Sequence, residues 1–121
     1  MKMIPLIKVK NIKEAIAFYT GILDFELKHP ADSLNEFGVD LINGDAELQL
    51  TSMEGIFGTI VNIRVDEIDE LFSKYLKRGL DTSAKKESPV HQSPLNQTWG
   101  MREFYVTDAD GNTLRFSMPI E

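Results

Sequence analysis

The sequence predicts an α+β protein made of two tandem βαβββ modules. The main observation is an internal repeat, in which residues 7–14 (IKVKNIKE) align with residues 63–70 (IRVDEIDE) at an offset of 56 (63 − 7). A second match aligns Phe37-Gly38-Val39 with Phe104-Tyr105-Val106 at a larger offset of 67 (104 − 37). The extra residues fall in a loop-like insert at 84–100, so each half keeps the same order of elements.

We expect a single domain, residues 1–121, divided into repeats at residues 1–56 and 57–121. A chain of this length can bury roughly two-thirds of its unfolded surface without staples. The absence of cysteine excludes disulfides, thiolate metal sites and cysteine nucleophiles. The net charge of -6 argues against a nucleic-acid partner, and no run approaches the ~18 apolar residues of a membrane span. A cytoplasmic protein is therefore expected, with neither nucleic acid nor membrane as a partner.

Each predicted helix follows a short strand and has start and stop signals. The first begins at Asn11, which stands three residues before Glu14 in capping-box spacing, and ends near Gly21. Its apolar face is formed by Ile12, Ala15, Ile16 and Tyr19. The second begins at Asp66 and ends near Gly79, where a C-terminal cap belongs. Its apolar face is formed by Ile68, Leu71, Phe72 and Tyr75.

Three strands are expected after each helix, from runs that alternate apolar and polar residues. The first half has them near residues 25–29, 34–41 and 46–51, and the second half near residues 81–85, 102–107 and 113–118. The last two strands are joined by Asp108-Ala109-Asp110-Gly111-Asn112. Glycine stands fourth in this segment, whereas a calcium loop has it sixth, so we interpret the segment as a hairpin turn.

Strand alternation divides these residues between two faces. The apolar positions should pack beneath a helix: Leu48, Leu50, Val61, Ile63, Val65, Phe104, Val106, Leu114, Phe116 and Met118. The opposite positions are polar or aromatic: Glu47, Gln49, Asn62, Arg64, Glu103, Tyr105 and Arg115. Such a face is either the solvated side of an antiparallel sheet or the wall of a ligand groove.

The single tryptophan, Trp99, has two interpretations at this stage. It is either a core plug over a sheet end or a ring platform at the mouth of a groove, where a planar ligand could stack. We predict the following ligand-binding residues: Gln49, Asn62, Trp99, Glu103, Tyr105 and Arg115.

Several segments resemble the vicinal oxygen chelate superfamily. Its opening is matched by Val9-Lys10-Asn11-Ile12, Ala17-Phe18-Tyr19 and Leu23-Asp24-Phe25. Residues 99–104 (WGMREF) and 108–112 (DADGN) are similar to the closing segment of its glyoxalase/bleomycin-resistance branch. The resemblance implies paired βαβββ modules that form a cupped sheet, assembly as a homodimer, and a repertoire of metal-dependent lyases, dioxygenases and epimerases alongside drug-sequestering proteins.

The resemblance also implies four metal-ligand positions, which fall on Ile4, Gln49, Ile60 and Arg115. Two isoleucines offer no lone pair, the arginine carries a permanent positive charge, and the glutamine alone is a weak neutral donor. The two histidines, His29 and His91, are expected to lie away from these positions. We therefore predict no metal, no cofactor and no catalytic residue.

We expect a metal-independent small-molecule binding protein that reversibly sequesters an amphipathic or aromatic ligand in a concave groove. The alternative is a lyase or isomerase of the same superfamily with a non-standard or metal-free site. Such an enzyme would use Glu47 or Glu103 for acid-base chemistry, although arginines expected nearby would lower their pKa values rather than raise them.

Overall fold

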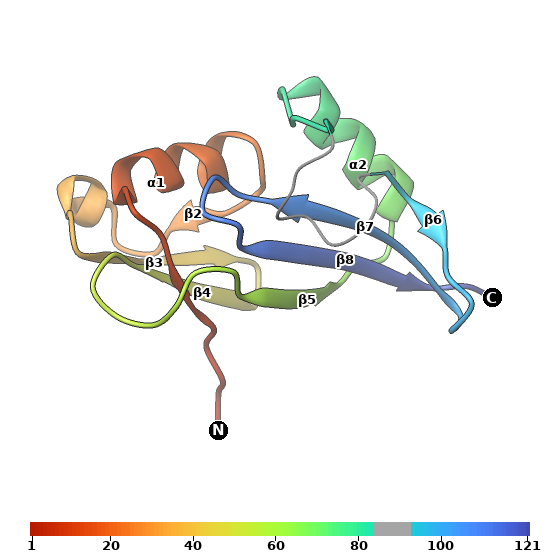
Figure 1. The fold of residues 1–121 in the computed structure, drawn as a ribbon, viewed down its shortest axis with the longest axis horizontal. Coiled ribbons are helices and arrows are strands. Elements are labelled where there is room, and N and C mark those ends of the chain that lie inside the picture. Colours follow the sequence, from red (N-terminus) through yellow and green to blue (C-terminus); the bar gives the residue numbers. More distant parts are fainter. Residues whose placement is uncertain (84–92) are drawn as a thin grey trace. The chain divides into compact units, whose positions relative to one another are not determined.

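The computed structural model describes residues 1–83 and 93–121 (Figure 1). The first module contains β1 (Leu6–Lys8), α1 (Ile12–Gly21), β2 (Glu26–Leu27), the 3-10 helix η1 (Pro30–Leu34), β3 (Gly38–Asn43) and β4 (Ala46–Thr51). The second contains β5 (Ile60–Arg64), α2 (Ile68–Lys77), β6 (Leu95–Asn96), β7 (Met101–Thr107) and β8 (Thr113–Pro119). The predicted α+β fold of two βαβββ modules is confirmed.

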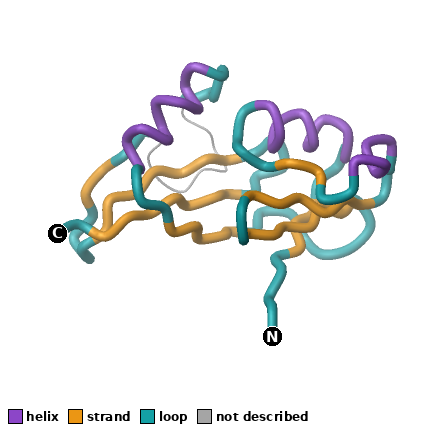
Figure 2. The backbone as a smooth tube through the Cα atoms, turned by 180° about the vertical axis from the view of Figure 1, so that it is seen from behind, coloured by secondary structure: helices purple, strands orange, loops and turns teal. Residues whose placement is uncertain are grey.

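Each module forms a four-stranded mixed sheet with the same topology. The strand order is β1-β4-β3-β2 in the first sheet and β5-β8-β7-β6 in the second. The first strand of each module runs parallel to the last, and the remaining neighbours are antiparallel. Each helix lies over one face of its own sheet (Figure 2). The face away from the helix is called the open face below.

The chain divides into two compact units that cut across the order of the sequence. The first comprises Met1–Thr59 with Asp108–Asn112, and the second comprises Ile60–Thr107 with Thr113–Glu121. The turn between β7 and β8 therefore belongs to the first unit, although both strands belong to the second. A single domain of two repeats remains our proposal for how the chain is organised.

Helix α1 begins where the sequence predicts, because the Asn11 side chain accepts a hydrogen bond from the Glu14 backbone N–H at 2.9 Å. The predicted start of α2 at Asp66 is wrong, since the helix begins at Ile68 after Glu67, whose side chain makes no capping bond. Acidic residues in the first turn still favour this end through the helix dipole. Gly79 follows α2 with a φ of 99°, a left-handed conformation that glycine adopts readily.

Two of the predicted strands differ from the structure. Residues 30–34 form η1, and Pro30 stands at its start with φ already fixed. The Asn35 side chain then accepts hydrogen bonds from the backbone N–H groups of Phe37 and Gly38, so the predicted 34–41 strand begins only at Gly38. Asp81–Ser83, the described part of the predicted 81–85 strand, is not a strand. The Asp81 carboxylate there accepts hydrogen bonds from the backbone N–H and hydroxyl of Ser83, which favours a local turn. Residues 84 and 85 lie outside the described residues, and β6 supplies the missing strand.

Strand register corrects the repeat alignment in the third strand of each module. Leu50 pairs with Ile7 and Val39, while the equivalent Phe116 pairs with Ile63 and Phe104. Val39 is thus the counterpart of Phe104, at an offset of 65 (104 − 39) rather than 67. Because alternation in a strand has a period of two, a shift of two residues leaves the predicted faces of β7 unchanged.

The predicted core faces are confirmed for the central strands. In the first unit the most deeply buried apolar side chains are Ile7, Val9, Ile12, Tyr19, Leu23, Leu41, Leu48 and Leu50. In the second unit, Phe104 stacks on Phe116 with ring centroids 4.8 Å apart, and Tyr75 of α2 contacts both rings edge-on. Val61, Ile63 and Val65 are half-buried rather than buried, because β5 lies at the edge of its sheet.

The Asp108–Asn112 turn is a buried polar junction within the first unit. The Asp108 carboxylate accepts hydrogen bonds from the Tyr19 hydroxyl at 2.9 Å and from the Asn112 amide at 3.0 Å. The Asn112 side chain also donates to the Lys8 carbonyl and accepts from the backbone N–H groups of Gly58 and Thr59. The turn thus ties helix α1, the end of β1 and the segment before β5 together, and the hairpin interpretation is correct.

Candidate ligand-binding site

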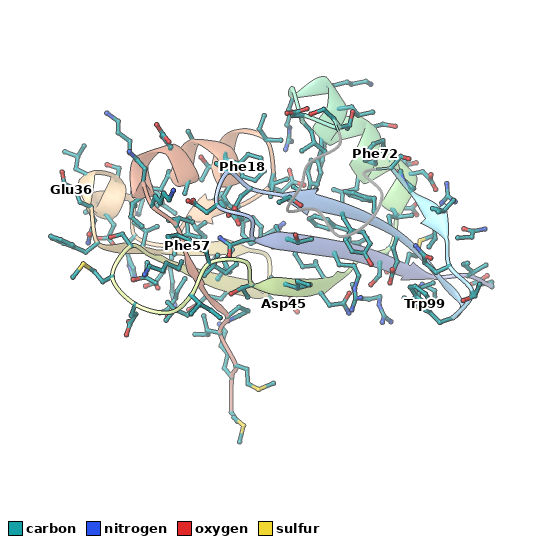
Figure 3. The ribbon with its side chains drawn as sticks, viewed as in Figure 1. Phe18, Glu36, Asp45, Phe57, Phe72 and Trp99 are labelled. Atoms are coloured by element: carbon teal, nitrogen blue, oxygen red, sulfur yellow. The ribbon has the colours of Figure 1, made fainter. Side chains whose placement is uncertain are left out.

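Three strands present the predicted site residues of the second unit on one open face. Register places Asn62, Arg115 and Tyr105 side by side on β5, β8 and β7. The next row along the strands is formed by Arg64, Ser117 and Glu103. Trp99 lies in the turn before β7, where its indole contacts the Glu103 carboxylate of this face, on the opposite side of the strands from Phe72 (Figure 3). Five of the six predicted site residues therefore lie on one surface of the second sheet.

The Glu103 carboxylate is the centre of this surface. Its Oε2 atom lies 3.4 Å from the Trp99 indole Nε1 and 3.9 Å from the Arg115 Nε, and its Oε1 lies 3.4 Å from the Tyr105 hydroxyl. The Arg115 Nε also donates to the Asn62 amide oxygen at 3.2 Å. We call these five residues the Glu103 cluster: Asn62, Trp99, Glu103, Tyr105 and Arg115.

Glu103 and Tyr105 are buried, with 3% and 5% of their surface exposed, so these two positions do not form the solvated side of a sheet. The donors that converge on the Glu103 carboxylate offset the cost of burying it, since a buried carboxylate requires hydrogen-bond partners. The polar face is thus a packed network at its centre rather than a simple solvated surface.

Trp99 is 60% exposed, so its interpretation as a core plug is wrong. It lies in the turn between β6 and β7, where the Gly100 N–H donates to the Gln97 carbonyl and the Gly100 carbonyl accepts from Ile120. The turn therefore fixes the backbone of Trp99 while the ring stays largely open to solvent. The contact with Glu103 holds the polar edge of the indole, which leaves ring surface for stacking.

Gln49 lies on the open face of the first sheet, in a different unit from the Glu103 cluster. Its amide donates to the Asp40 carboxylate at 2.9 Å, and the His29 Nε2 lies 3.7 Å from the other Asp40 oxygen. His29 is thus connected to Gln49 through the Asp40 carboxylate. His91 lies outside the described residues.

A groove of about 410 Å³ runs along this open face of the first unit. Its exposed apolar residues are Leu6, Phe37 and Met53, the buried residues Val39 and Leu50 also border it, and its polar lining includes Asp32, Asp40, Gln49, Thr51 and Glu54. A mixture of exposed apolar groups and a few polar ones is typical of small-molecule sites.

Glu47 has lysine partners rather than the arginines expected from the sequence. Lys2 and Lys28 place their Nζ atoms 2.9 and 3.0 Å from one Glu47 oxygen, and only 6% of the glutamate side chain is exposed. Hydrogen bonds from these two lysines lower the pKa of Glu47. The predicted direction of the pKa shift is therefore correct, although the residues that cause it are not those expected.

The four positions implied for a metal do not suit a divalent cation. Ile60 has no donor atom, Arg115 directs its Nε at Asn62, and the Gln49 amide is engaged with Asp40. Within residues 1–83 and 93–121, no three side chains among His, Cys, Asp and Glu come together as a metal site. No helix in the same part of the chain is long and apolar enough to span a membrane.

Arg64 and Ser117 lie on the same face as the predicted site residues but were not among them, although strand alternation places both there. Ser117 pairs with Arg64 on one side and Glu103 on the other, and its hydroxyl lies 3.3 Å from the Asn62 amide oxygen. Asp40 was missed because the 34–41 strand was predicted to begin too early and its faces were left unassigned.

Comparisons with known proteins agree with this architecture. Residues 5–116 match the family described as the Glyoxalase/Bleomycin resistance protein/Dioxygenase superfamily. A bleomycin resistance protein of Geobacillus stearothermophilus is 29% identical over 140 aligned positions, which cover 100% of this chain and 98% of the relative. The solved structure of a bleomycin-binding protein complexed with bleomycin shares the fold with a TM-score of 0.79, at 20% identity over 98% of both chains.

A bleomycin resistance determinant encoded on the transposon Tn5 has the same fold, with a TM-score of 0.78 and 18% identity over 98% of both chains. The family match covers nearly the whole sequence. The chain therefore belongs to the Glyoxalase/Bleomycin resistance protein/Dioxygenase superfamily. The resemblance noted in the sequence is confirmed.

Proposed function

We propose that this protein reversibly binds a small amphipathic or aromatic molecule on the open face of its second sheet and does not transform it. The proposal rests on the Glu103 cluster, where an exposed indole ring stands beside a buried carboxylate and a guanidinium group. Rings that combine an apolar face with a polar edge suit such ligands. Gln49 is proposed to contact a ligand within the groove of the first unit.

Relatives support small-molecule binding as the general function. One solved structure of this fold is a bleomycin-binding protein complexed with bleomycin, and a curated relative is named a bleomycin resistance protein. Bleomycin is therefore one compound to test. A thermal-shift screen against antibiotics and metabolites is the first experiment, since a ligand at a hundred times its Kd stabilises a protein by about 2.7 kcal/mol.

Binding without a metal is part of the proposal, because the implied ligand positions hold Ile4, Gln49, Ile60 and Arg115. Among these, only the glutamine could donate a lone pair to a cation. A protein that binds without a metal keeps its affinity after treatment with a chelator, whereas a metal-dependent one loses it.

An enzymatic alternative, a lyase or isomerase with a non-standard or metal-free site, would depend on Glu47 or Glu103. Glu47 is poorly suited as a general acid near neutral pH, because its two lysine partners lower its pKa. Mass spectrometry of a bound compound after long incubation separates the two functions. Intact compound supports reversible binding, whereas a converted product that disappears in Glu103→Gln or Glu47→Gln establishes the alternative.

We further propose a homodimer, because the edge strand of each sheet, β1 or β5, carries an exposed apolar side chain. Leu6 of β1 is 41% exposed and Ile60 of β5 is 57% exposed. A second copy of the chain could cover them. Sedimentation at micromolar concentration should give a species of twice 13.7 kDa, and a clean monomer would refute the dimer. The cytoplasmic location expected from the sequence also remains a prediction, which cell fractionation would test.

A further inference from the structure

We propose that the site on the second sheet selects an aromatic carboxylate, with Arg64 and Arg115 forming its anion-binding pair. This inference rests on the proposed function, because it names the chemical class of ligand that the same open face binds. The overall charge of -6 would by itself favour a cationic ligand rather than an anionic one.

The charge of this face is opposite in sign to that of the chain. On the open face of β5, β7 and β8, the charged residues are two arginines and one glutamate: Arg64, Arg115 and Glu103. The Glu103 side chain is only 4% exposed, and its oxygens are engaged by the indole N–H and the Tyr105 hydroxyl. One guanidinium charge is therefore left uncompensated within these three strands, and an incoming anion would balance it.

The hydrogen-bonding groups of both arginines point to the same ligand chemistry. Arg115 uses its Nε for Asn62 and Glu103, and its two terminal amino groups have no partner within the described residues. Arg64 is exposed, and across the same described part of the chain its side chain makes no hydrogen bond or ion pair. A guanidinium group presents a planar fork of N–H donors that matches a carboxylate.

The two arginines are close enough to serve one ligand. Arg115 pairs with Asn62 in the β5–β8 register, and Arg64 lies two residues further along β5. With strands about 4.8 Å apart and about 3.3 Å per residue, their Cα atoms are roughly 8 Å apart. Two long side chains at this spacing can reach a single carboxylate from either side.

The surroundings of the pair favour an aromatic body on the same ligand. Trp99 is 60% exposed and Leu95, which pairs with Glu103 in register, is 53% exposed. A planar ring could stack on the indole while its carboxylate reaches the arginines. A cationic aromatic compound would instead meet two guanidinium groups, which would weaken its binding.

The test uses isothermal titration with three compounds that share one ring system: 2-naphthoate, 2-naphthamide and 2-naphthylmethylammonium. We expect 2-naphthoate to bind the wild-type protein about tenfold or more tightly than the neutral amide, since tenfold corresponds to about 1.4 kcal/mol and hydrogen bonds to charged groups are stronger than those between neutral groups. The ammonium compound should bind most weakly. The double variant Arg64→Gln/Arg115→Gln should lose the preference for the carboxylate.

Arg102→Gln is the matched control, because Arg102 lies on β7 with its Nη2 2.7 Å from Asp69 of α2, and alternation places it on the other face of the sheet. It should keep the preference. Equal binding of 2-naphthoate and 2-naphthamide, tighter binding of the ammonium compound, or a preference that persists in the double variant would overturn the inference. The first two results need only wild-type protein, so the test does not depend on the variant folding. Binding of the amide alone would leave the proposed function standing, whereas no binding by any compound at millimolar concentration would count against both.

Discussion

The indole Nε1 of Trp99 lies 3.4 Å from Oε2 of Glu103, so the one tryptophan of the chain is held by its polar edge while 60% of the residue remains exposed. Glu103 is itself 3% exposed and is fixed on β7, the central partner of β6 and β8. A ring held in this way loses little additional freedom when a ligand stacks on it. The contact therefore gives the site a preformed platform.

Replacing Glu103 should change the motion of Trp99 before any ligand is added. Glu103→Ala removes the acceptor for the indole N–H, so the ring should become more mobile, whereas Glu103→Gln retains an acceptor oxygen and should keep most of the restraint. Time-resolved fluorescence anisotropy of the single tryptophan measures this directly. Equal anisotropy decays in wild type and Glu103→Ala would show that the contact does not hold the ring.

The turn at residues 108–112 should be the most sensitive polar site in the first unit. Asn112 is 0% exposed, and Asn112→Ala would leave the N–H groups of Gly58 and Thr59 and the Lys8 carbonyl without their partner. Because each unsatisfied buried group costs about 1–3 kcal/mol, we expect a loss of roughly 3–5 kcal/mol in the free energy of unfolding. Urea denaturation measures it.

The control for this variant is Asp45→Ala, in the exposed turn between β3 and β4. Because its side chain is exposed, the change should stay within about 0.5 kcal/mol. A loss for Asn112→Ala as small as that of the control would mean that the junction contributes little to stability.

Alkaline pH should destabilise the protein through Tyr19. Burial, reinforced by the Asp108 carboxylate, raises the pKa of the Tyr19 hydroxyl well above its ordinary value. The folded state therefore holds this proton more tightly than the unfolded state, so the associated stability is complete below about pH 10 and is lost as the pH rises above it. Unfolding free energies at pH 8 to 11 should show this decline. Tyr19→Phe should be less stable at pH 8 but should decline less steeply, and an identical slope would refute the role of Tyr19.

Purified protein should contain no stoichiometric transition metal. The implied positions offer only the Gln49 amide, which is bonded to Asp40, and a permanently charged Arg115. Elemental analysis after mild purification should find well below one zinc, nickel, iron or manganese ion per chain. About one ion per chain that is lost in Gln49→Ala would contradict this expectation.

The fold was predicted best in the segments that both repeat between the two halves and alternate apolar with polar residues. The offset of 56 between the first strand-helix units and the alternation in β4, β7 and β8 were enough to predict the modules and the faces of these strands. Local interactions limited the rest. The Asn35 side chain bonds to the backbone of Phe37 and Gly38 within the predicted 34–41 strand, and the Asp81 side chain bonds to Ser83 where a strand was expected.

The candidate site was predicted in position but not in character. Alternation placed Glu103 and Tyr105 on the open face, yet only the structure shows that hydrogen-bond donors converge on Glu103 and bury it. Two of these donors, Trp99 and Tyr105, are close to Glu103 in sequence, but their approach to it depends on how the side chains pack. Contacts between strands, such as that of Arg115 with Asn62, also depend on register, which the residue pattern does not fix. The partners of Glu47 were missed because Lys2 and Lys28 lie outside the strands, where alternation makes no prediction.

The most direct test of the central claim is a titration of wild-type protein and Trp99→Ala with one compound that emerges from the thermal-shift screen. The account predicts a saturable change in Trp99 fluorescence in wild type, and about fivefold or greater loss of affinity in the variant by calorimetry, equivalent to about 1 kcal/mol. The variant should unfold at nearly the wild-type denaturant concentration, because Trp99 is 60% exposed. Unchanged affinity in Trp99→Ala, or a loss of stability of about 3–5 kcal/mol as for a buried aromatic ring, would contradict it.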